Sequence, residues 1–476
     1  MPSLTSLVKA YDVRGVVPDQ LDEHVARALG AAFAAVVGVA DSSADGDAPR
    51  RVVVGHDMRP SSPSLSRAFA EGVAAQGGDV VLIGLCSTDG LYYASGSLGA
   101  PGAMFTASHN PAQYNGIKMC FAGARPVGQD SGLVTVRELA EAYLDDGVPT
   151  GATPGTITEQ DLLLGYASYL RDLVDLSGGR PLKVVVDAGN GMGGFTVPAV
   201  LEQSAGLPAL PLSVVPLYFE LDGTFPNHEA NPLDPKNLVD LQAAVVEHGA
   251  DLGLAFDGDA DRCFVIDERG EPVSPSAVTG LVAAREIAKE RAAGREPVVI
   301  HNLISSRAVP EVIAESGGTA VRTRVGHSFI KAQMASEQAV FGGEHSAHYY
   351  FRDFWFADTG MLAAMHVLAA LGEQQGPLSE LASSYERYVA SGEINSTVTD
   401  AADRTRAVRA ELATDDVAVD ELDGTTLTLD GPDGRPVWWL NLRASNTEPL
   451  LRLNVEAADE ATMATVRDRA LAIIRA

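Results

Sequence analysis

The chain has 476 residues, of which 46% are hydrophobic and 21% are charged, and its formal net charge is -28. This length and composition exclude a disordered or collagen-like protein and predict several globular domains. The negative charge argues against a nucleic-acid or anionic-membrane partner, because its field repels phosphate. An anionic small substrate would therefore need a local pocket of cationic side chains.

The first residues, MPSLTSLVKAYDVRG, lack a basic region followed by a long apolar stretch, and the early apolar run at 29–40 is too short to span a bilayer. Three cysteines occur, Cys86, Cys120 and Cys263, without CxxC spacing. They are typical of buried thiols in a reducing compartment. We therefore expect a cytoplasmic protein.

Three stretches share a β-branched run followed by a polar turn: RVVVGHD (51–57), KVVVDAGN (183–190) and PVVIHNL (297–303). Such runs predict strands buried on both faces of an α/β sheet. Their starts lie roughly 110 to 130 residues apart, the size of a domain, which indicates an α/β unit used three times. Helical patterns between them, at 21–37 and 237–249, favour a βαβ arrangement.

The division into domains follows from these patterns. We expect α/β domains at 1–150, 151–255 and 256–372, and a smaller α+β domain at 373–476 whose last strands are VWWLNLR and LLRLNVEA. The stretch VPTGATPG (148–155) is the best linker candidate, and 41–50 is typical of an exposed loop.

The run TASHNPAQYNGIKMC (106–120) is the first of four stretches suited to chemistry. Ser108 lies in a loop rich in Gly, Pro and Asn with Lys118 nearby, which suits a nucleophile or phosphate carrier. We do not expect its neighbour His109 to act as its base, because adjacent side chains generally point apart. The simpler interpretation is a serine that caps a turn.

The stretch VVVDAGNGMGG carries Gly189, Gly191 and Gly194 in GxGxxG spacing after a predicted strand. A dinucleotide site needs an acidic residue about 20 positions further on, and ALPLSVVPL occupies that region. A tight turn from strand to helix is therefore the favoured interpretation.

In LGLAFDGDADRCFVIDE, the side chains of Asp257, Asp259 and Asp261 recur at every second position. Three converging carboxylates need a hard cation, and Mg²⁺ prefers such oxygen ligands. An EF-hand loop would have glycine where Arg262 stands and helices on both sides, whereas these flanks predict strands. We expect a divalent metal site, the alternative being a solvated acidic turn.

Two further loops carry polar side chains. In FGGEHSAHYY, Glu344, His345, Ser346 and His348 match no strong zinc pattern, and the Glu and Ser suit hydrogen bonds to sugar hydroxyls. In NLRASNTEPLLR, Arg443 and Arg452 flank a loop of hydroxyl and amide donors, which suits a phosphate, although an ordinary hairpin loop fits the spacing equally well.

Together these stretches indicate phosphoryl transfer on a phosphorylated polyol. The order KAYDVRG, TASHNP, DGDADR, GEHSAH and RASNTEP, spread over essentially the whole chain, resembles the α-D-phosphohexomutases, in particular their bacterial phosphomannomutase/phosphoglucomutase branch. The resemblance implies four domains around a central cleft, three of them related α/β units. It also implies a hexose phosphate as substrate and an isomerase that interconverts hexose 6-phosphate and hexose 1-phosphate.

The resemblance implies a role for each motif. Ser108 would be a phosphoserine that holds Mg²⁺ together with Asp257, Asp259 and Asp261, and a hexose 1,6-bisphosphate (of glucose or mannose) would be intermediate and activator. Glu344 and Ser346, with His345 beside them, would bind the sugar hydroxyls. The distal phosphate would be held by Arg443, Ser445, Asn446, Thr447 and Arg452.

The remaining site candidates are cationic or titratable side chains. Arg262 and Lys118 would stabilise charge at the transferred phosphoryl group, Lys118 and His327 are candidates for proton transfer, Arg14 would close the wall beside the phosphoserine, and Lys331 would contact phosphate. YDVRG and QYNGIK resemble the mannose/glucose branch rather than the phosphoglucosamine branch. The alternative functions are a phosphoglucosamine mutase and a non-catalytic protein that senses sugar phosphates. The sequence leaves monomer and homodimer open.

The sequence departs from the resemblance at one turn. Where many relatives have Pro-Thr-Pro before an aromatic strand, this chain has STDGLYYASG, so Ser87, Asp89 and Gly90 change the local geometry there.

Overall fold

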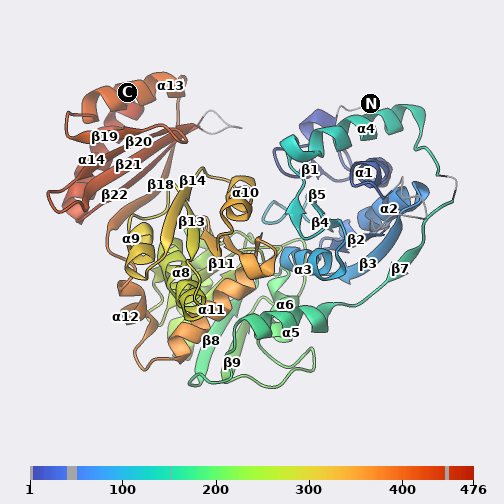
Figure 1. Ribbon diagram of the computed structural model, residues 1–476, viewed down its shortest axis with the longest axis horizontal. Helices are drawn as coiled ribbons and strands as arrows, with labels where there is room; N and C mark the ends of the chain where they lie inside the picture. The colour runs from blue at the N-terminus through green and yellow to red at the C-terminus, as the bar shows by residue number, and fades with distance from the viewer. Residues whose placement is uncertain (1–3, 40–50, 152, 445–449) are drawn as a thin grey trace. The chain divides into compact units, whose positions relative to one another are not determined.

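The computed structural model describes residues 4–39, 51–151, 153–444 and 450–476. Its chain forms two compact units, one of residues 1–273 with 346–379 and one of residues 274–345 with 380–476. Each unit contains sheets covered by helices (Figure 1). No helix of the described part has both the length and the hydropathy needed to cross a membrane.

The first unit begins with a mixed sheet in the order β1-β5-β4-β2-β3-β7, with β6 paired to β5. Its strands are β1 (Val13–Val16), β2 (Arg51–His56), β3 (Asp79–Leu85), β4 (Gly102–Phe105), β5 (Tyr114–Phe121), β6 (Arg125–Pro126) and β7 (Ile157–Glu159). Its helices are α1 (Glu23–Val36), α2 (Ser62–Ala75), α3 (Thr88–Leu98) and α4 (Leu133–Asp146). The rings of Phe33, Phe69 and Phe105 pack in series, 5.8 and 5.5 Å between centroids, and join α1, α2 and β4 in one core.

A second sheet in the same unit has the order β12-β11-β10-β8-β9. Its strands are β8 (Leu182–Asp187), β9 (Leu212–Leu217), β10 (Leu252–Phe256), β11 (Cys263–Asp267) and β12 (Pro272–Val273). The accompanying helices are α5 (Leu163–Leu173), α6 (Gly193–Val200) and α7 (Val239–His248). The unit ends with the hairpin β16 (Tyr349–Phe351) and β17 (Ala357–Asp358), followed by the buried helix α11 (Gly360–Gly372).

The second unit contains the parallel strands β13 (Val298–Asn302), β14 (Thr319–Thr323) and β15 (Phe341–Gly343), with β13 in the middle. Helices α8 (Pro275–Ala292), α9 (Ala308–Glu315) and α10 (His327–Glu337) connect and cover them. The short helix α12 (Leu378–Ser383) crosses the division between the two units. Within the ranges that the structure describes, 3-10 helices lie at Leu4–Ser6, Gln129–Ser131, Pro235–Leu238 and Arg352–Phe354.

The C-terminal sheet of the second unit is antiparallel, in the order β18-β22-β21-β20-β19. Its strands are β18 (Val389–Thr397), β19 (Val417–Asp420), β20 (Thr425–Asp430), β21 (Pro436–Ala444) and β22 (Leu450–Ala457). Helices α13 (Ala401–Leu412) and α14 (Glu460–Ile474) lie beside the strands (Figure 1), and Val408, Leu440, Leu453 and Val466 pack between helices and sheet.

The three α/β sheets repeat one topology. The strands predicted from the β-branched runs are β2, β8 and β13, and each lies between two parallel neighbours. In each case the next strand of the chain is one neighbour and the strand after that is the other. The predictions of α/β architecture, of a unit used three times and of buried thiols are confirmed.

The four domain ranges stay predictions. The expected boundary at residue 255 falls inside β10, which pairs with β8 on one side and β11 on the other. The linker candidate 148–155 leads to β7, which still pairs with β3 of the first sheet. The predicted exposed loop at 41–50 lies outside the described residues.

Candidate functional site

Three of the predicted functional loops occupy the same place in the repeated topology. Ser108 follows β4, Asp257 follows β10 and Glu344 follows β15, and each of these strands is the third parallel strand of its repeat. Ligands of α/β sheets bind beyond the carboxyl ends of parallel strands. The repeat therefore presents the serine, the aspartates and the sugar-binding candidates at equivalent edges.

Ser108 is almost fully buried, and its φ of 50° puts it in the left-handed region. Its Oγ donates to Oδ2 of Asp257 at 3.0 Å and also lies 3.0 Å from Nδ1 of His109. The expectation that His109 points away from Ser108 is therefore wrong. The positive φ of Ser108 departs from the extended backbone in which adjacent side chains alternate, and so the two side chains meet.

Arg59 holds the backbone of this loop, and the sequence analysis missed it. Its guanidinium donates to the carbonyl oxygens of Ser108 and Asn110 at 2.9 and 2.7 Å and to those of Pro111 and Tyr114 at 3.0 and 2.9 Å. The side chain is fully buried and pairs with Asp57 at 3.2 Å. An aspartate and an arginine directly after a buried strand, in GHDMRP, were the available signal.

The aspartate loop joins the antiparallel strands β10 and β11, which excludes the helix-flanked EF-hand. Asp257, Asp259 and Asp261 are buried, and one oxygen of each lies within 4.8 Å of the others. Lys118 Nζ donates to Oδ2 of Asp259 and of Asp261, both at 2.6 Å. Within the described residues, Oδ1 of Asp259 and Oδ1 of Asp261 receive no hydrogen bond. Buried carboxylate oxygens left over in this way fit a hard divalent cation.

Burial and charge set the protonation of this cluster. Burial raises the pKa of Asp257 despite the nearby Arg262. Burial would also raise the pKa of Asp259, but Lys118 and hydrogen bonds hold it below its usual value. Burial would lower the pKa of Lys118, whereas the carboxylates of Asp259 and Asp261 raise it well above its ordinary value. Lys118 is therefore an ammonium in this arrangement.

Two glycines allow the loops to approach each other. A Cβ at Gly258 would lie 2.4 Å from the carbonyl oxygen of Ser108, and one at Gly191 would lie 2.7 Å from the carbonyl oxygen of Gly258. The amide of Met192 donates to that same oxygen at 2.9 Å. The GxGxxG stretch thus forms the favoured turn from β8 to α6 and supports the aspartate loop.

Arg262 and Arg14 add cationic groups around Ser108. Arg262 pairs with Asp257 Oδ2 at 2.9 Å and donates to Nδ1 of His109. Arg14, on β1, donates to the side chain of Asn110 and to the carbonyl of Ala107. Burial and these two guanidinium groups lower the pKa of His109 to about 3, so its ring is neutral near pH 7.

The GEHSAH stretch is divided between the two units, and each part is described by itself. In the second unit, Glu344 accepts from Asn302 Nδ2 and from the amide of Gly326, and His345 Nδ1 lies 3.0 Å from Ser276 Oγ. In the first unit, Ser346 Oγ lies 3.1 Å from Nδ1 of His348. The Nε2 atom of His348 is 3.7 Å from Asp261 Oδ1, so His348 adjoins the aspartates, which sequence spacing could not show.

The remaining candidates belong to the second unit. Lys331 is buried in α10, and His327 is the first residue of that helix, its side chain lying outside the description. Arg443 and Arg452 are direct cross-strand partners on β21 and β22, and Arg452 donates to Glu393 at 3.3 Å. Ser445, Asn446 and Thr447 lie outside the described residues.

The STDG turn is built around a buried carboxyl. Oδ2 of Asp89 accepts from Tyr166 at 2.8 Å and from Thr359 at 2.7 Å, and Oδ1 accepts from Ser87. The adjacent Thr88 begins α3 and donates through Oγ1 to Asp259 at 2.6 Å. The altered turn thus contacts α5 through Tyr166 and the start of α11 through Thr359. Thr88, at the start of α3, links it to the aspartate loop.

Comparison with known proteins covers nearly the whole chain. Four models of one family match in order: phosphoglucomutase/phosphomannomutase alpha/beta/alpha domain I at 5–141, domain II at 165–270, domain III at 275–388 and the C-terminal domain at 393–473. A protein of Xanthomonas campestris pv. campestris described as "Phosphohexose mutases" is 39% identical over 462 residues, 96% of each chain. The phosphomannomutase of Salmonella typhimurium is 38% identical over 466 residues, 97% of each.

A solved structure shares the fold over the same extent. The crystal structure of a phosphoglucomutase/phosphomannomutase family protein from Burkholderia thailandensis matches with a TM-score of 0.83 and 30% identity, covering 99% of this chain and 98% of that one. The sequence motifs and the fold therefore point to the same group of proteins.

Proposed function

The chain belongs to the phosphoglucomutase/phosphomannomutase family and is a phosphohexomutase, an isomerase, and we propose that it interconverts the 6-phosphate and 1-phosphate of mannose and glucose through a phosphoserine at Ser108. The observation that carries the proposal is that Ser108 Oγ contacts a buried aspartate loop, whose carboxylates in turn contact the cationic side chains of Arg262 and Lys118. Phosphoryl transfer requires this combination of positioning and charge stabilisation.

Atoms balance over two transfers. In the first, the Oγ–P bond of the phosphoserine breaks, the free hydroxyl of a hexose monophosphate forms an O–P bond and loses its proton, and Ser108 Oγ takes up a proton. The hexose 1,6-bisphosphate then turns end for end. In the second, the other sugar O–P bond breaks and its phosphoryl group bonds to Ser108 Oγ, which loses its proton, while the sugar oxygen takes up a proton. Neither sugar oxygen–carbon bond breaks.

Asp257, Asp259 and Asp261 together with the oxygen on Ser108 would hold Mg²⁺. When bound, Mg²⁺ supplies neutralisation of the charge on the transferred phosphoryl oxygens. Two aspartate oxygens that receive no hydrogen bond from the described residues, and the 3.0 Å approach of Ser108 to Asp257, support this assignment. Gly258 and the turn at Gly191 keep the loop close enough for the serine and the carboxylates to act together.

The cationic side chains would act on the phosphoryl group and its acceptor. Arg262 and Lys118 stabilise negative charge as the phosphoryl group moves, and Arg14 closes the wall beside Ser108. Asp259 and Asp261 hold Lys118 as an ammonium, and Lys118 and His327 remain our candidates for proton transfer.

The GEHSAH stretch, helix α10 and the C-terminal sheet would recognise the sugar phosphate. Glu344 and Ser346 bind hydroxyl groups, with His345 and Lys331 in support. Arg443, Arg452 and the stretch with Ser445, Asn446 and Thr447 bind the phosphate that is not reacting. This cradle must accept either end of the bisphosphate, which suits flexible bidentate arginine contacts better than contacts specific to one sugar carbon.

Intact-protein mass and phosphopeptide mapping test the proposal. We expect one phosphate on Ser108 that is lost when mannose 1-phosphate or glucose 1-phosphate is added with Mg²⁺. Ser108→Ala should abolish turnover, whereas the matched change Ser97→Ala, at an exposed position on α3, should not. Turnover retained in Ser108→Ala would overturn the role of the serine, and a preference for glucosamine phosphate over both hexose phosphates would move the enzyme to the phosphoglucosamine branch.

A further inference from the structure

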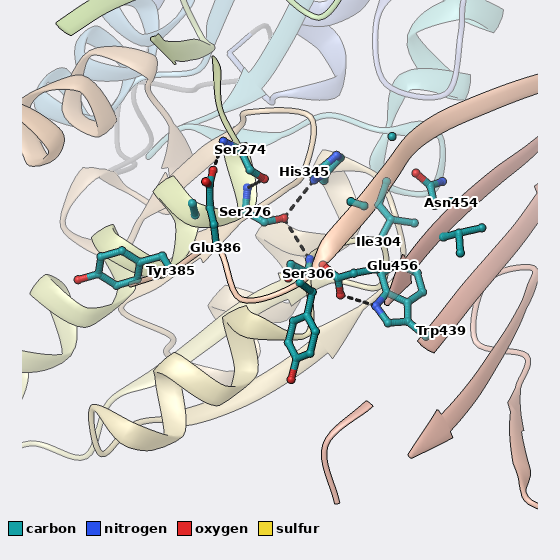
Figure 2. Close-up of a pocket in the computed structure, with 15 residues that line it drawn as sticks. Ser274, Ser276, Ile304, Ser306, His345, Tyr385, Glu386, Trp439, Asn454 and Glu456 are labelled. Carbon is teal, nitrogen blue, oxygen red and sulfur yellow. Dashed lines mark hydrogen bonds between the residues drawn. The ribbon is translucent and has the colours of Figure 1, made fainter. Parts of the chain in front are cut away.

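A cavity of about 200 Å³ lies in the second unit, between the β13 side and the C-terminal sheet. Its lining includes the buried residues Ser276, Trp439, Asn454 and Glu456 and the exposed residue Glu386 (Figure 2). The exposed Gly392 also lines it. At about 30 Å³ for each water of the liquid, the space corresponds to roughly seven water molecules. It is therefore large enough for a small ligand.

A β-bulge lies beside this cavity. The pairing of β18 with β22 shifts register between Ala390 and Glu393, and Gly392 takes a φ of 67°. Within the bulge, Ser391 Oγ accepts from the amide of Val455 at 3.0 Å. Bulges commonly redirect side chains beside binding sites. Here the bulge lies over the strand segment that carries Asn454 and Glu456, which share one face because they are two residues apart.

The walls carry both fixed and unused polar groups. Glu456 accepts from Trp439 Nε1 at 2.6 Å and from the amide of Arg307 at 3.0 Å, and Ser276 Oγ joins His345 Nδ1 to the amide of Ser306 (Figure 2). Among the described residues, neither the side-chain amide of Asn454 nor Nε2 of His345 has a hydrogen-bond partner. Asn454 is only 7% exposed. The amide of Asn454 lines the cavity, so a ligand there can donate to its oxygen and accept from its nitrogen.

The chemistry of the lining selects the class of ligand. Two carboxylates, Glu386 and Glu456, and no lysine or arginine line the cavity, so a phosphate would be repelled. Glu456 already receives two hydrogen bonds, so it does not need a ligand cation. Hydroxyl, amide and imidazole groups line the cavity together with the aromatic rings of Tyr385, Tyr388 and Trp439. Such a mixture contacts both the hydroxyls and the C–H faces of a polyol.

We propose that this cavity is a second ligand site that binds an uncharged polyhydroxylated molecule of about the size of a hexose. Its lining contains none of the residues around Ser108, and the proposal does not depend on the proposed mutase mechanism. The ligand accepts and donates hydrogen bonds at the side-chain amide of Asn454 and packs on Trp439.

Trp439 supplies a direct readout. We would titrate the full-length protein with D-sorbitol through the millimolar range and follow tryptophan fluorescence. The expected result is a saturable change that disappears in Trp439→Phe and is weakened at least tenfold in Asn454→Leu. The matched change Asn395→Leu, at an exposed position of β18 outside the cavity, should leave the titration unchanged. Mutase turnover of Asn454→Leu without sorbitol checks that the variant is folded.

Two further titrations distinguish this site from others. Sodium phosphate should neither cause the change nor displace sorbitol, and saturating mannose 1-phosphate should leave the sorbitol response in place. A response that stays linear in all variants, equal saturation in Asn454→Leu, binding of phosphate in the cavity, or competition by mannose 1-phosphate would each overturn the proposal.

Discussion

The guanidinium of Arg59 donates a 2.9 Å hydrogen bond to the backbone oxygen of Ser108. Three more carbonyl oxygens of the same loop are held by this one buried side chain. The position of the Ser108 hydroxyl, our proposed phosphate carrier, thus depends on a residue that contacts only the backbone of the loop. Arg59 is in this sense a positioning residue, and Asp57 fixes its guanidinium in turn.

Arg59→Lys keeps the charge but cannot reproduce the four carbonyl contacts. We expect a lower kcat with little change in KM and less phosphate on Ser108, because the loop geometry and not substrate binding is disturbed. Arg59→Met leaves Asp57 buried without its partner and should cost about 3 kcal/mol of unfolding free energy. Steady-state kinetics and urea unfolding measure both effects. Arg27→Lys, in an exposed ion pair of α1, is the control and should change neither.

Gly258→Ala would place a methyl group against the carbonyl of Ser108, where the Cβ would lie at 2.4 Å. Backbone cannot move aside as a side chain can, so the aspartate loop must shift. We expect kcat to fall on the order of 100-fold while the protein stays folded. Gly178→Ala adds a methyl group with no atom within 4 Å and should be silent. Equal kcat values for the two variants would contradict the importance of this approach.

Lys118 competes with any cation for Asp259 and Asp261, because its ammonium contacts both carboxylates. Lys118→Met should therefore bind Mg²⁺ at least tenfold more tightly, about 1.4 kcal/mol, even though its turnover falls. Lys118→Arg keeps the charge and should stay near the wild-type affinity. Calorimetric titration of the metal-free proteins measures this without turnover. Unchanged affinity in Lys118→Met would show that the ammonium does not occupy the metal position.

The buried carboxyl of Asp89 should make the folded protein less stable as pH rises from about 4 to about 6. Burial raises its pKa from the usual 3.8 to about 6, although three hydroxyl donors oppose the shift. Between these values the folded state binds more protons than the unfolded state, so stability falls as pH rises through this window. A shift of about two units corresponds to about 3 kcal/mol. Asp89→Asn cannot ionise and should lack this loss.

The difference in unfolding free energy between wild type and Asp89→Asn, measured by urea titration across pH, isolates the effect because other groups cancel. We expect the wild type to lose about 3 kcal/mol relative to the variant between pH 3.8 and about 6. A flat difference would mean that Asp89 stays ionised throughout.

The sequence by itself determined the repeated architecture and marked the motifs that we propose to react. Continuous β-branched runs, such as those at 51–57 and 183–190, are typical of strands buried on both faces of a sheet. The local pattern alone therefore predicted β2, β8 and β13. Ser108 and the three aspartates were found because residue type and spacing along a few positions carry the chemical signal. Short-range information sufficed for both.

Only the tertiary structure decided which distant residues meet. Arg59 and Ser108 are 49 positions apart, Lys118 and Asp259 are 141 apart, and Asp89 and Thr359 are 270 apart. No local pattern encodes such contacts, because they arise when separate strands end at one sheet edge. The turn of His109 toward Ser108 likewise depends on a positive φ that tight packing imposes and that residue type does not reveal.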